Sequence, residues 1–360
     1  MRSTWKTITL NATLCFALAV GGLAACDDDV PGTVPDVSSD AGIDSGSDAG
    51  SDAAADTGNP DVGTDQGPDP DTSGDTNVNP ALAAYQACFP YLVEVLDIDV
   101  IPETVVAEHC AGTNHQTIDD VDKIVVLGDS ISVGVGANND ASAYFSILRE
   151  NLEAYYGHSI AFENCAVGGS VNANLQGQIN TCFPGVESAR TLVVFTSGGN
   201  DVANMAFNDV NLATGVNSVD AMIGYLDSAL AVFDDTTKFP AGVFVVLADV
   251  YEYTDATAVL QSCPLATFAG FPGVWADALG IFRYLTAEYV RTTTKYGRDM
   301  IFMQETFCGH GHNKDSPDGP CHEVAGELWF GRDCLHPNDM GHKAIADLFY
   351  RVVVGLAPPQ

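Results

Sequence analysis

Residues able to carry out nucleophilic catalysis occur at two distant places in the chain. Ser130 ends a Gly-Asp-Ser tripeptide after a short β-branched run, and the glycines that follow allow a tight turn that leaves its hydroxyl accessible. Asp333 precedes His336 by three residues. At this spacing a carboxylate can reach Nδ1 of the imidazole and leave Nε2 to accept the proton of a serine. We therefore predict Ser130 as a nucleophile, with His336 and Asp333 as its partners.

Hydrogen-bond donors for a developing oxyanion occur in two further glycine-rich segments. Gly169 lies in residues 164–170, near an expected second strand, and Asn200 lies in a Ser-Gly-Gly-Asn-Asp segment after the next strand. Glycine lets a backbone N–H approach a reacting oxygen closely, and an asparagine amide offers a side-chain N–H. The chain contains no G-x-S-x-G motif, since Ser132 stands where its second glycine would be. The nucleophile elbow of ordinary α/β-hydrolases is therefore excluded.

The elements that must position these residues are strands that alternate with helices. Apolar, β-branched runs typical of strands buried on both faces occupy residues 123–127, 192–196, 243–247 and 300–303. Apolar stripes at helical spacing run through residues 144–155 and 345–352, and Asn338 is an expected N-cap of the last helix. This alternation predicts a parallel, helix-covered α/β sheet. Ligands bind beyond the carboxyl ends of such strands, where the candidate residues lie.

Four sequence blocks together resemble those of the SGNH (GDSL-type) hydrolase family. In chain order the blocks are Gly128-Asp129-Ser130, Gly169, Asn200 and Asp333-x-x-His336. The resemblance extends over residues 123–354. It implies a flavodoxin-like three-layer α/β/α architecture with a five-stranded parallel sheet, the SGNH hydrolase fold.

The same resemblance implies a role for each residue. His336 would act as general base and then as general acid, and Asp333 would orient it. The N–H groups of Ser130 and Gly169 and the side chain of Asn200 would form the oxyanion hole. The reaction expected is hydrolysis of a carboxylic ester through an acyl-enzyme, for which no metal or organic cofactor is required.

The substrate is expected to be a small-molecule, lipid or glycan ester. Two long loops, residues 251–273 and 306–332, follow strands and are expected to shape the pocket. Aromatic residues in or near these loops are candidates for an acyl or aryl pocket: Tyr251, Tyr253, Phe268, Phe271, Trp275, Trp329 and Phe330. The first hypothesis is an esterase or lipase acting on a carboxylic ester of a small or lipid-like alcohol. The alternatives are an O-acetylesterase of surface glycans and a tethered binding protein without turnover.

The first 25 residues have the composition of an export signal. Arg2 and Lys6 precede an apolar stretch that ends in Leu-Ala-Ala-Cys, which resembles a bacterial lipobox. Cys26 is therefore predicted to carry lipid, and an ordinary secretory signal is the alternative. No other segment approaches the roughly 18 uninterrupted apolar residues of a membrane span. We expect a protein of the bacterial cell envelope, lipid-anchored to a membrane and facing the periplasm or the cell exterior.

The segment after the proposed lipid site is strongly acidic. Residues 27–80 contain 14 aspartates and no Lys, Arg or aromatic residue, which predicts that residues 26–80 form a disordered tether. The whole chain carries 48 acidic and 14 basic residues, a net charge of -34, so nucleic acid is excluded as a partner. Residues 81–120 are expected to form an extension packed on a hydrolase domain that spans residues 121–360. A monomer is expected.

The ten cysteines indicate an oxidising compartment. Eight remain once Cys15 leaves with the signal and Cys26 takes lipid, and an even number in an exported chain predicts disulfides. Closeness in the chain favours three pairings and elimination leaves a fourth, although other connectivities remain open: Cys88 with Cys110, Cys165 with Cys182, Cys308 with Cys321, and Cys263 with Cys334. The alternative is a metal bound by Cys308, Cys321 and the loop histidines His310, His312 and His322. Their spacing fits no zinc motif, so no metal site is expected.

Overall fold

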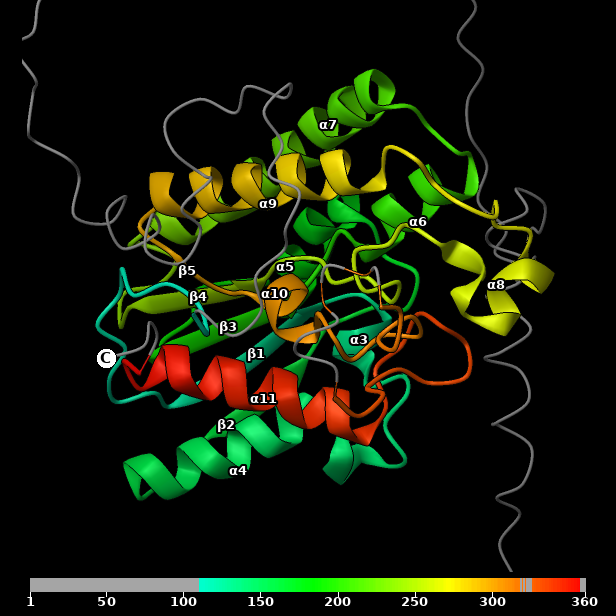
Figure 1. The fold of residues 1–360 in the computed structure, drawn as a ribbon. Helices are drawn as coiled ribbons and strands as arrows, with labels where there is room; N and C mark the ends of the chain where they lie inside the picture. The colour runs from blue at the N-terminus through cyan, green and yellow to red at the C-terminus, as the bar shows by residue number, and fades with distance from the viewer. Residues whose placement is uncertain (1–109, 318, 320, 322–325, 357–360) are drawn as a thin grey trace, which may run out of the picture.

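The computed structural model describes residues 110–317, 319, 321 and 326–356 (Figure 1). In this part of the chain five strands form one sheet in the order β2-β1-β3-β4-β5, and every neighbouring pair is parallel. The strands are β1 (Lys123–Gly128), β2 (Ala161–Asn164), β3 (Thr191–Thr196), β4 (Val243–Ala248) and β5 (Asp299–Ile301). The predicted α/β class with a five-stranded parallel sheet is confirmed.

Helices cover both faces of the sheet and complete three layers. Helices α4 and α11 pack together on one face, while α5, α7 and α9 cover the other (Figure 1). The longer helices are α4 (Tyr144–Tyr156), α5 (Leu175–Cys182), α6 (Gly199–Phe207), α7 (Leu212–Ala231), α9 (Ala278–Lys295) and α11 (Asp339–Val353). The shorter ones are α3 (Ser130–Val133), α8 (Pro264–Ala269) and α10 (Met303–Phe307), with 3₁₀ turns η1 (Asp140–Ser142), η2 (Asn172–Asn174), η3 (Val232–Asp234) and η4 (Leu260–Ser262).

The central strands are buried on both faces. All six residues of β3 are buried, as are the last five of β1 and the last four of β4. A sheet covered by helices on both sides has no polar face, which explains why these strands are continuously apolar rather than alternating.

The strand expected at residues 300–303 was placed too far along the chain. It ends at Ile301, and Met303 already belongs to α10. The reason is a capping interaction, since Asp249 Oδ1 accepts hydrogen bonds from the N–H groups of Met303 (2.6 Å) and Gln304 (3.1 Å). A side chain just after the neighbouring strand β4 therefore caps the start of the helix, which the local sequence does not show.

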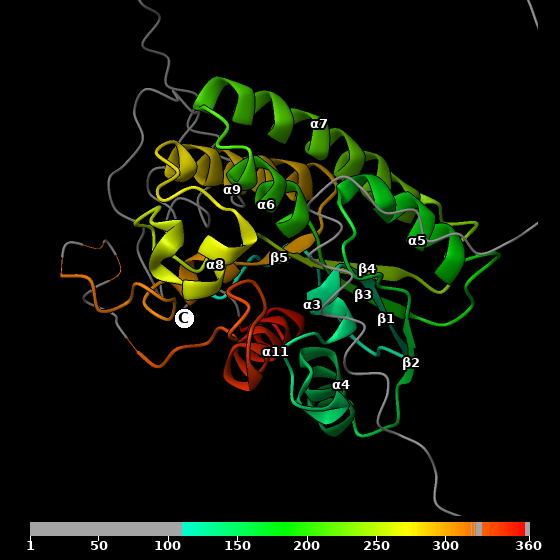
Figure 2. The same cartoon turned by 90° about the vertical axis from the view of Figure 1, so that its right-hand side faces the viewer.

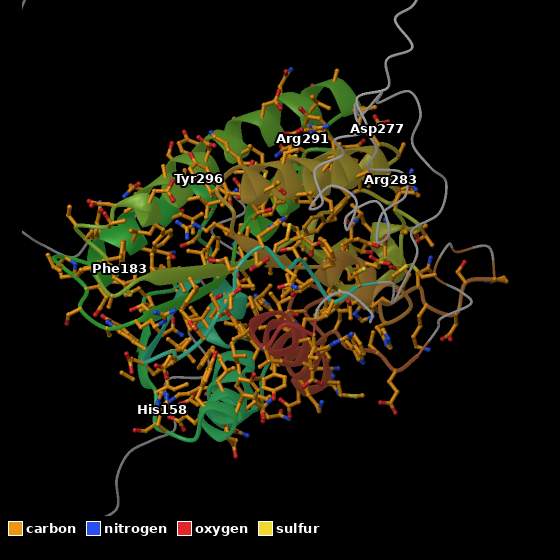
Figure 3. The ribbon with its side chains drawn as sticks, turned by 90° about the vertical axis from the view of Figure 1, so that its left-hand side faces the viewer. His158, Phe183, Asp277, Arg283, Arg291 and Tyr296 are labelled. Atoms are coloured by element: carbon orange, nitrogen blue, oxygen red, sulfur yellow. A yellow bond between two sulfur atoms is a disulfide. The ribbon has the colours of Figure 1, made fainter. Side chains whose placement is uncertain are left out.

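Helices α7 and α9 lie side by side over the sheet. Asp277, just before α9, accepts a hydrogen bond from the N–H of Leu212 at the start of α7 (3.1 Å). Gly215 permits a close approach, because a Cβ at this position would lie 2.3 Å from a side-chain carbon of Ile281. Asp277 and Tyr296 mark the two ends of α9 in Figure 3, which views the molecule from the opposite side to Figure 2.

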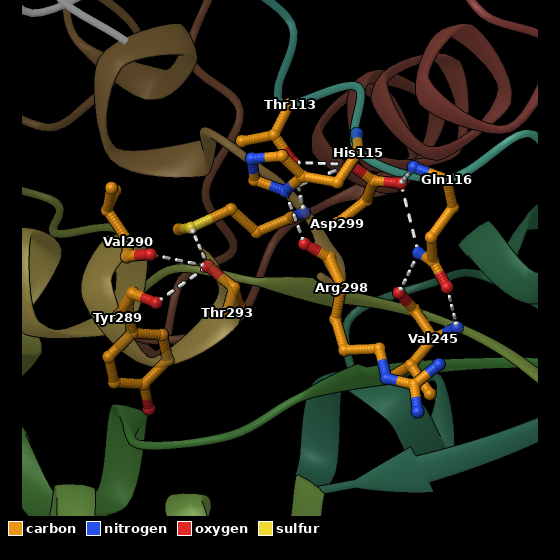
Figure 4. Close-up of polar contacts among 10 residues, drawn as sticks. Thr113, His115, Gln116, Val245, Tyr289, Val290, Thr293, Arg298 and Asp299 are labelled. Carbon is orange, nitrogen blue, oxygen red and sulfur yellow. Dashed lines mark hydrogen bonds and ion pairs between the residues drawn. The ribbon is translucent and has the colours of Figure 1, made fainter. Parts of the chain in front are cut away.

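The segment before β1 closes the outer edge of the sheet along β5 (Figure 4). Gly112 forms an antiparallel bridge with Ile301. The buried Asp299 carboxylate accepts hydrogen bonds from the Thr113 hydroxyl (2.7 Å), the N–H of His115 (2.6 Å) and Gln116. These contacts occupy an edge that would otherwise expose unpaired backbone groups.

Several expectations concern residues outside the described part of the chain. The signal at residues 1–25, Cys26, the tether, Cys88 and most of the extension at residues 81–120 all lie outside the described residues. Among the described helices, none has the length and apolar character needed to cross a membrane.

Candidate active site

Ser130 stands where β1 turns into α3, at the carboxyl edge of the sheet. Asp129 caps α3 through a hydrogen bond from the N–H of Ile131 to its carboxylate (3.1 Å), which makes Ser130 the first residue of the helix. Gly128 permits this turn, because it adopts a φ of +118° and a Cβ there would lie 2.0 Å from the carbonyl oxygen of Thr196.

The structure brings Ser130, His336 and Asp333 together although His336 lies 206 residues after the serine. His336 Nε2 lies 2.7 Å from Ser130 Oγ, and His336 Nδ1 lies 2.7 Å from an Asp333 carboxylate oxygen. The other carboxylate oxygen accepts the backbone N–H of His336 at 3.1 Å. Ser130 is 8% exposed and His336 is 6% exposed, so their hydrogen bond is largely shielded from water.

The carboxyl groups of this region differ in their pKa values. Burial opposes ionisation of Asp333, but the hydrogen bond and charge of His336 outweigh it and hold the pKa of Asp333 below its ordinary value. Burial instead raises the pKa of Asp129 to about 6, although Thr196 and Ile131 donate hydrogen bonds to it. Asp333 is therefore the carboxylate suited to stabilise a positively charged imidazole.

The predicted oxyanion donors lie on neighbouring segments. Asn200 lines the same cavity as Ser130, and one N–H of its amide donates to the carbonyl oxygen of Ser170 (2.8 Å), which orients the side chain. Gly169 precedes Ser170 in an exposed turn with a φ of +81°. The N–H of Ser130 has no partner within α3, because the first N–H groups of a helix lack one.

A predominantly apolar cavity opens beside Ser130 and leaves about 100 Å³ for the centres of water-sized molecules. Its chemical end is formed by Ser130, Asn200 and His336. Most of the remaining wall is apolar and comes from α6, the loop after β4 and the start of α9: Val202, Ala206, Tyr251, Tyr253, Leu260, Phe271, Trp275, Leu279 and Phe282. The cavity suits an apolar group attached to a carbonyl held at Ser130.

The sequence profile of the GDSL-like lipase/acylhydrolase family matches residues 124–349, well over half of the chain. The chain belongs to the GDSL-like lipase/acylhydrolase family. It is a carboxylic ester hydrolase of this family, as its resemblance to SGNH (GDSL-type) hydrolases implies. No curated protein matches the chain.

Three solved structures illustrate what the fold resembles. An extracellular lipase of Streptomyces rimosus is 20% identical with a TM-score of 0.44, over 63% of this chain and 97% of the lipase. A phospholipase A1 of Streptomyces albidoflavus is 21% identical with a TM-score of 0.42, over 64% and 98% of the two chains. An acetylxylan esterase of Geobacillus stearothermophilus is 16% identical with a TM-score of 0.41, over 66% and 96%.

Two polar residues of this GDSL-like hydrolase were missed at the level of sequence. Gln178 on α5 accepts the N–H of Gly128 (2.6 Å) and donates to the Gly128 carbonyl (2.8 Å) and the Ser170 hydroxyl (2.9 Å). It thus joins the segments that carry Ser130 and Gly169. Asp249 lines the cavity after β4, and its Oδ2 is buried with no hydrogen-bond partner among the described residues. Burial raises the pKa of Asp249 to about 7.

A hydrogen-bond network lies behind the turn that carries Ser130. The Ser132 hydroxyl lies 2.7 Å from the Tyr144 hydroxyl and 2.9 Å from the Thr196 hydroxyl, which donates to Asp129 at 2.7 Å. These side chains are buried. The network fixes Asp129, and therefore the turn that presents Ser130.

The two long loops contribute unequally to the cavity. Of the aromatic candidates, Tyr251, Tyr253, Phe271 and Trp275 line it, as expected. The expectation for residues 306–332 was wrong, because none of the described residues of this loop lines the cavity. They pack behind the first loop instead: Phe307 stacks on Tyr251 at 4.7 Å, Phe330 meets Tyr251 edge-on, and Trp329 stacks on His310. Phe268 faces solvent.

Three disulfides occur at the expected pairs. They join Cys165 with Cys182, Cys263 with Cys334 and Cys308 with Cys321. The fourth expected pair includes Cys88, which lies outside the described residues. The bond from Cys263 reaches the short turn between Asp333 and His336, where Cys334 adopts a φ of +72°. A non-glycine residue in this region stores roughly 1–3 kcal/mol of strain, which the surrounding structure must hold.

Proposed function

We propose that the protein is a serine esterase that uses Ser130, His336 and Asp333 as a catalytic triad. The observation that carries this proposal is the continuous hydrogen-bond chain, 2.7 Å from serine to imidazole and 2.7 Å from imidazole to carboxylate. In this series of hydrogen bonds the imidazole takes the proton of the serine, and the carboxylate stabilises the imidazolium that forms.

Acylation begins when His336 Nε2 takes the hydroxyl proton and Oγ of Ser130 attacks the ester carbonyl carbon. The electron pair of the carbonyl moves to its oxygen, and we assign the N–H groups of Ser130 and Gly169 and the Asn200 amide to that oxyanion. When the carbonyl re-forms, the bond to the leaving oxygen breaks. The protonated His336 gives its proton to this oxygen, and the alcohol departs.

Deacylation repeats these steps with water in place of the alcohol. His336 takes a proton from water, the hydroxide adds to the acyl carbon, and the oxyanion forms again. Its collapse breaks the bond to Oγ, and His336 returns the proton to Ser130. The acid product leaves and the resting enzyme is restored.

The apolar cavity favours an ester with an acyl chain of several carbons over an acetyl ester. The leaving alcohol must depart before water arrives, so the acyl group is the part that occupies the cavity throughout. Each buried methylene contributes about 0.8 kcal/mol, which rewards a chain of several carbons. Deacetylation of a glycan, the alternative substrate class, would leave most of this apolar wall unused.

The test is the rate of hydrolysis of p-nitrophenyl esters from acetate to palmitate, with the Ser130→Ala variant as blank. We expect a serine-dependent kcat/KM that rises from acetate to a medium-length chain. A maximum at acetate would favour the O-acetylesterase. The absence of any serine-dependent rate in folded, oxidised protein would favour glycan-linked acetyl esters first and the non-catalytic binding protein second.

We further propose that the enzyme is displayed on the cell envelope through lipid on Cys26, with residues 26–80 as tether and a hydrolase domain at residues 121–360. The lipobox-like sequence and the acidic, aromatic-free composition support this proposal. Metabolic labelling with a radioactive fatty acid tests it. Label should be incorporated by the wild type and lost in Cys26→Ala, and label retained in the variant would exclude this lipid site.

A further inference from the structure

Three large apolar side chains are exposed together on α8 and the turn after it. Phe268 is 87% exposed, Val274 is 55% exposed and Leu265 is 45% exposed. We call these three residues the α8 patch. Single exposed apolar residues are common on proteins, but three within ten residues of one short segment are not explained by packing.

The segment that carries the α8 patch contains no charge. Between Asp255 and Asp277 there is no acidic or basic residue, in a chain whose net charge is -34. Because the segment is uncharged, a neutral surface can approach it without removing water from a charged side chain.

The α8 patch lies next to the candidate active site. Cys263, the residue before α8, is joined to Cys334, two residues before His336, with a Cα–Cα distance of 5.8 Å. The same segment lines the substrate cavity through Leu260, Phe271 and Trp275. Its inner side chains therefore bound the cavity while its outer side chains form the patch.

Further exposed apolar residues border the other side of the site. Val133 and Val135 follow Ser130, and Met340 begins α11 just after His336. Their segments touch, because the carbonyl oxygen of Val135 lies 3.1 Å from His342 Nε2 on α11. Figure 2 views the side of the molecule that carries α8.

We propose that the α8 patch inserts into the surface of a neutral or zwitterionic lipid layer and so delivers ester lipids to the cavity. The proposal rests on the proposed esterase function for the fate of the lipid, but surface binding itself needs no turnover. Aromatic and aliphatic side chains anchor proteins by entering the headgroup region. A second copy of the chain is the less suitable occupant. Stable interfaces bury about 800 Å², from about 20–30 residues, on each partner, and the α8 patch consists of three residues. Two copies of this acidic chain would also repel each other.

The experiment measures binding of the chain to phosphatidylcholine vesicles by flotation. The protein begins at residue 26 and carries Cys26→Ser, so that neither the signal segment nor attached lipid contributes. Leu265→Ser with Phe268→Ser removes most of the α8 patch. Val186→Ser with Tyr225→Ser is the matched control, because these residues are 68% and 53% exposed on elements away from the site.

We expect vesicle binding to fall at least about tenfold in the α8 double variant and to stay at the wild-type level in the control. Equal losses in both variants, or no binding by the wild type, would overturn the proposal. So would a wild-type dimer that becomes a monomer in the α8 variant, since the patch would then join two copies. Hydrolysis of dissolved p-nitrophenyl acetate by wild type and Ser130→Ala, followed in parallel, reports the proposed esterase function separately.

Discussion

Ser130 and His336, the proposed nucleophile and base, are each less than one-tenth exposed, while the side chain of Asp333 is 47% exposed. The proton transfer therefore takes place in a shielded site, where electrostatic interactions are stronger than in water. The Asp333 carboxylate lies at the other end of these hydrogen bonds, and the hydrogen bond and charge of His336 favour its ionised form. This division suits a triad in which the carboxylate stays charged.

The Asn200→Ala variant tests the oxyanion assignment. The amide is held by its hydrogen bond to Ser170, so it is preorganised toward a developing charge. We expect kcat on a p-nitrophenyl ester to fall by about 10²–10³ while KM changes little. Circular dichroism and thermal unfolding of the variant provide the folding control. A loss of less than tenfold would contradict the assignment.

We expect Asp249 to make the stability of the folded protein depend on pH. Burial raises its pKa to about 7, so the folded state keeps a proton that the unfolded state loses. Its contribution to stability is complete below the ordinary pKa of an aspartate and is lost as the pH rises through about 7. Asn retains an oxygen that can cap α10 but does not ionise.

We therefore expect the melting temperature of Asp249→Asn, relative to wild type, to be higher at pH 8 than at pH 5. Thermal unfolding at both pH values measures this difference. Asp299→Asn is the comparison variant, because Asp299 is a buried aspartate that does not line the cavity. A difference between Asp249→Asn and wild type that is the same at both pH values would contradict the buried, protonated state of Asp249.

At the scale of elements, the disulfide between Cys263 and Cys334 holds α8 against the turn that carries His336. Its two cysteines are separated by 71 residues, and removal of such a bond usually costs about 2–5 kcal/mol. Removal of the bond also releases Cys334, which lies between Asp333 and His336 and has a φ of +72°. We expect Cys263→Ser with Cys334→Ser to lower both the melting temperature and kcat.

Cys308→Ser with Cys321→Ser is the matched control for this bond. That disulfide lies in a loop whose described residues do not line the cavity, so its loss should lower stability and leave kcat within about threefold of wild type. Equal effects of the two double variants on kcat would show that the bond at α8 has no special role in positioning the site.

The elements that were predictable are those whose signal is local. The β-branched runs located β1, β3 and β4, because strands buried on both faces need continuous apolar sequence. Asn338 was expected as an N-cap and its side chain accepts the N–H groups of Met340 and Gly341. The end of β5 was misplaced, because α10 is started by Asp249 from another strand, a contact separated by more than fifty residues.

The same rule separates the candidate site residues that the sequence indicates from those that only the fold reveals. Ser130, Gly169, Asn200, Asp333 and His336 stand in short, chemically distinctive blocks. Gln178 lies in the middle of an ordinary helix, and only the fold brings it to both carbonyl and amide of Gly128. Nothing in the local pattern of a buried glutamine distinguishes a positioning residue from one that faces solvent.

In the whole molecule, the candidate site residues gather at the carboxyl edge of an otherwise apolar sheet. The register aligns Gly128, Thr196 and Ala248 on adjacent strands, so the residues that follow them meet at that edge. One of these, Asp129, caps the helix that begins with Ser130, the proposed nucleophile, and another, Asp249, lines the cavity. The segment that carries the α8 patch, between Asp255 and Asp277, contains no charged residue.

Covalent labelling tests whether His336 activates Ser130 as the nucleophile. The whole chain is treated with a fluorophosphonate, and the rate and position of the adduct are determined by intact mass and peptide mapping. We predict a single adduct on Ser130, none in Ser130→Ala, and labelling at least about 100-fold slower in His336→Ala. An adduct on another residue, or a labelling rate unchanged in His336→Ala, would contradict the account.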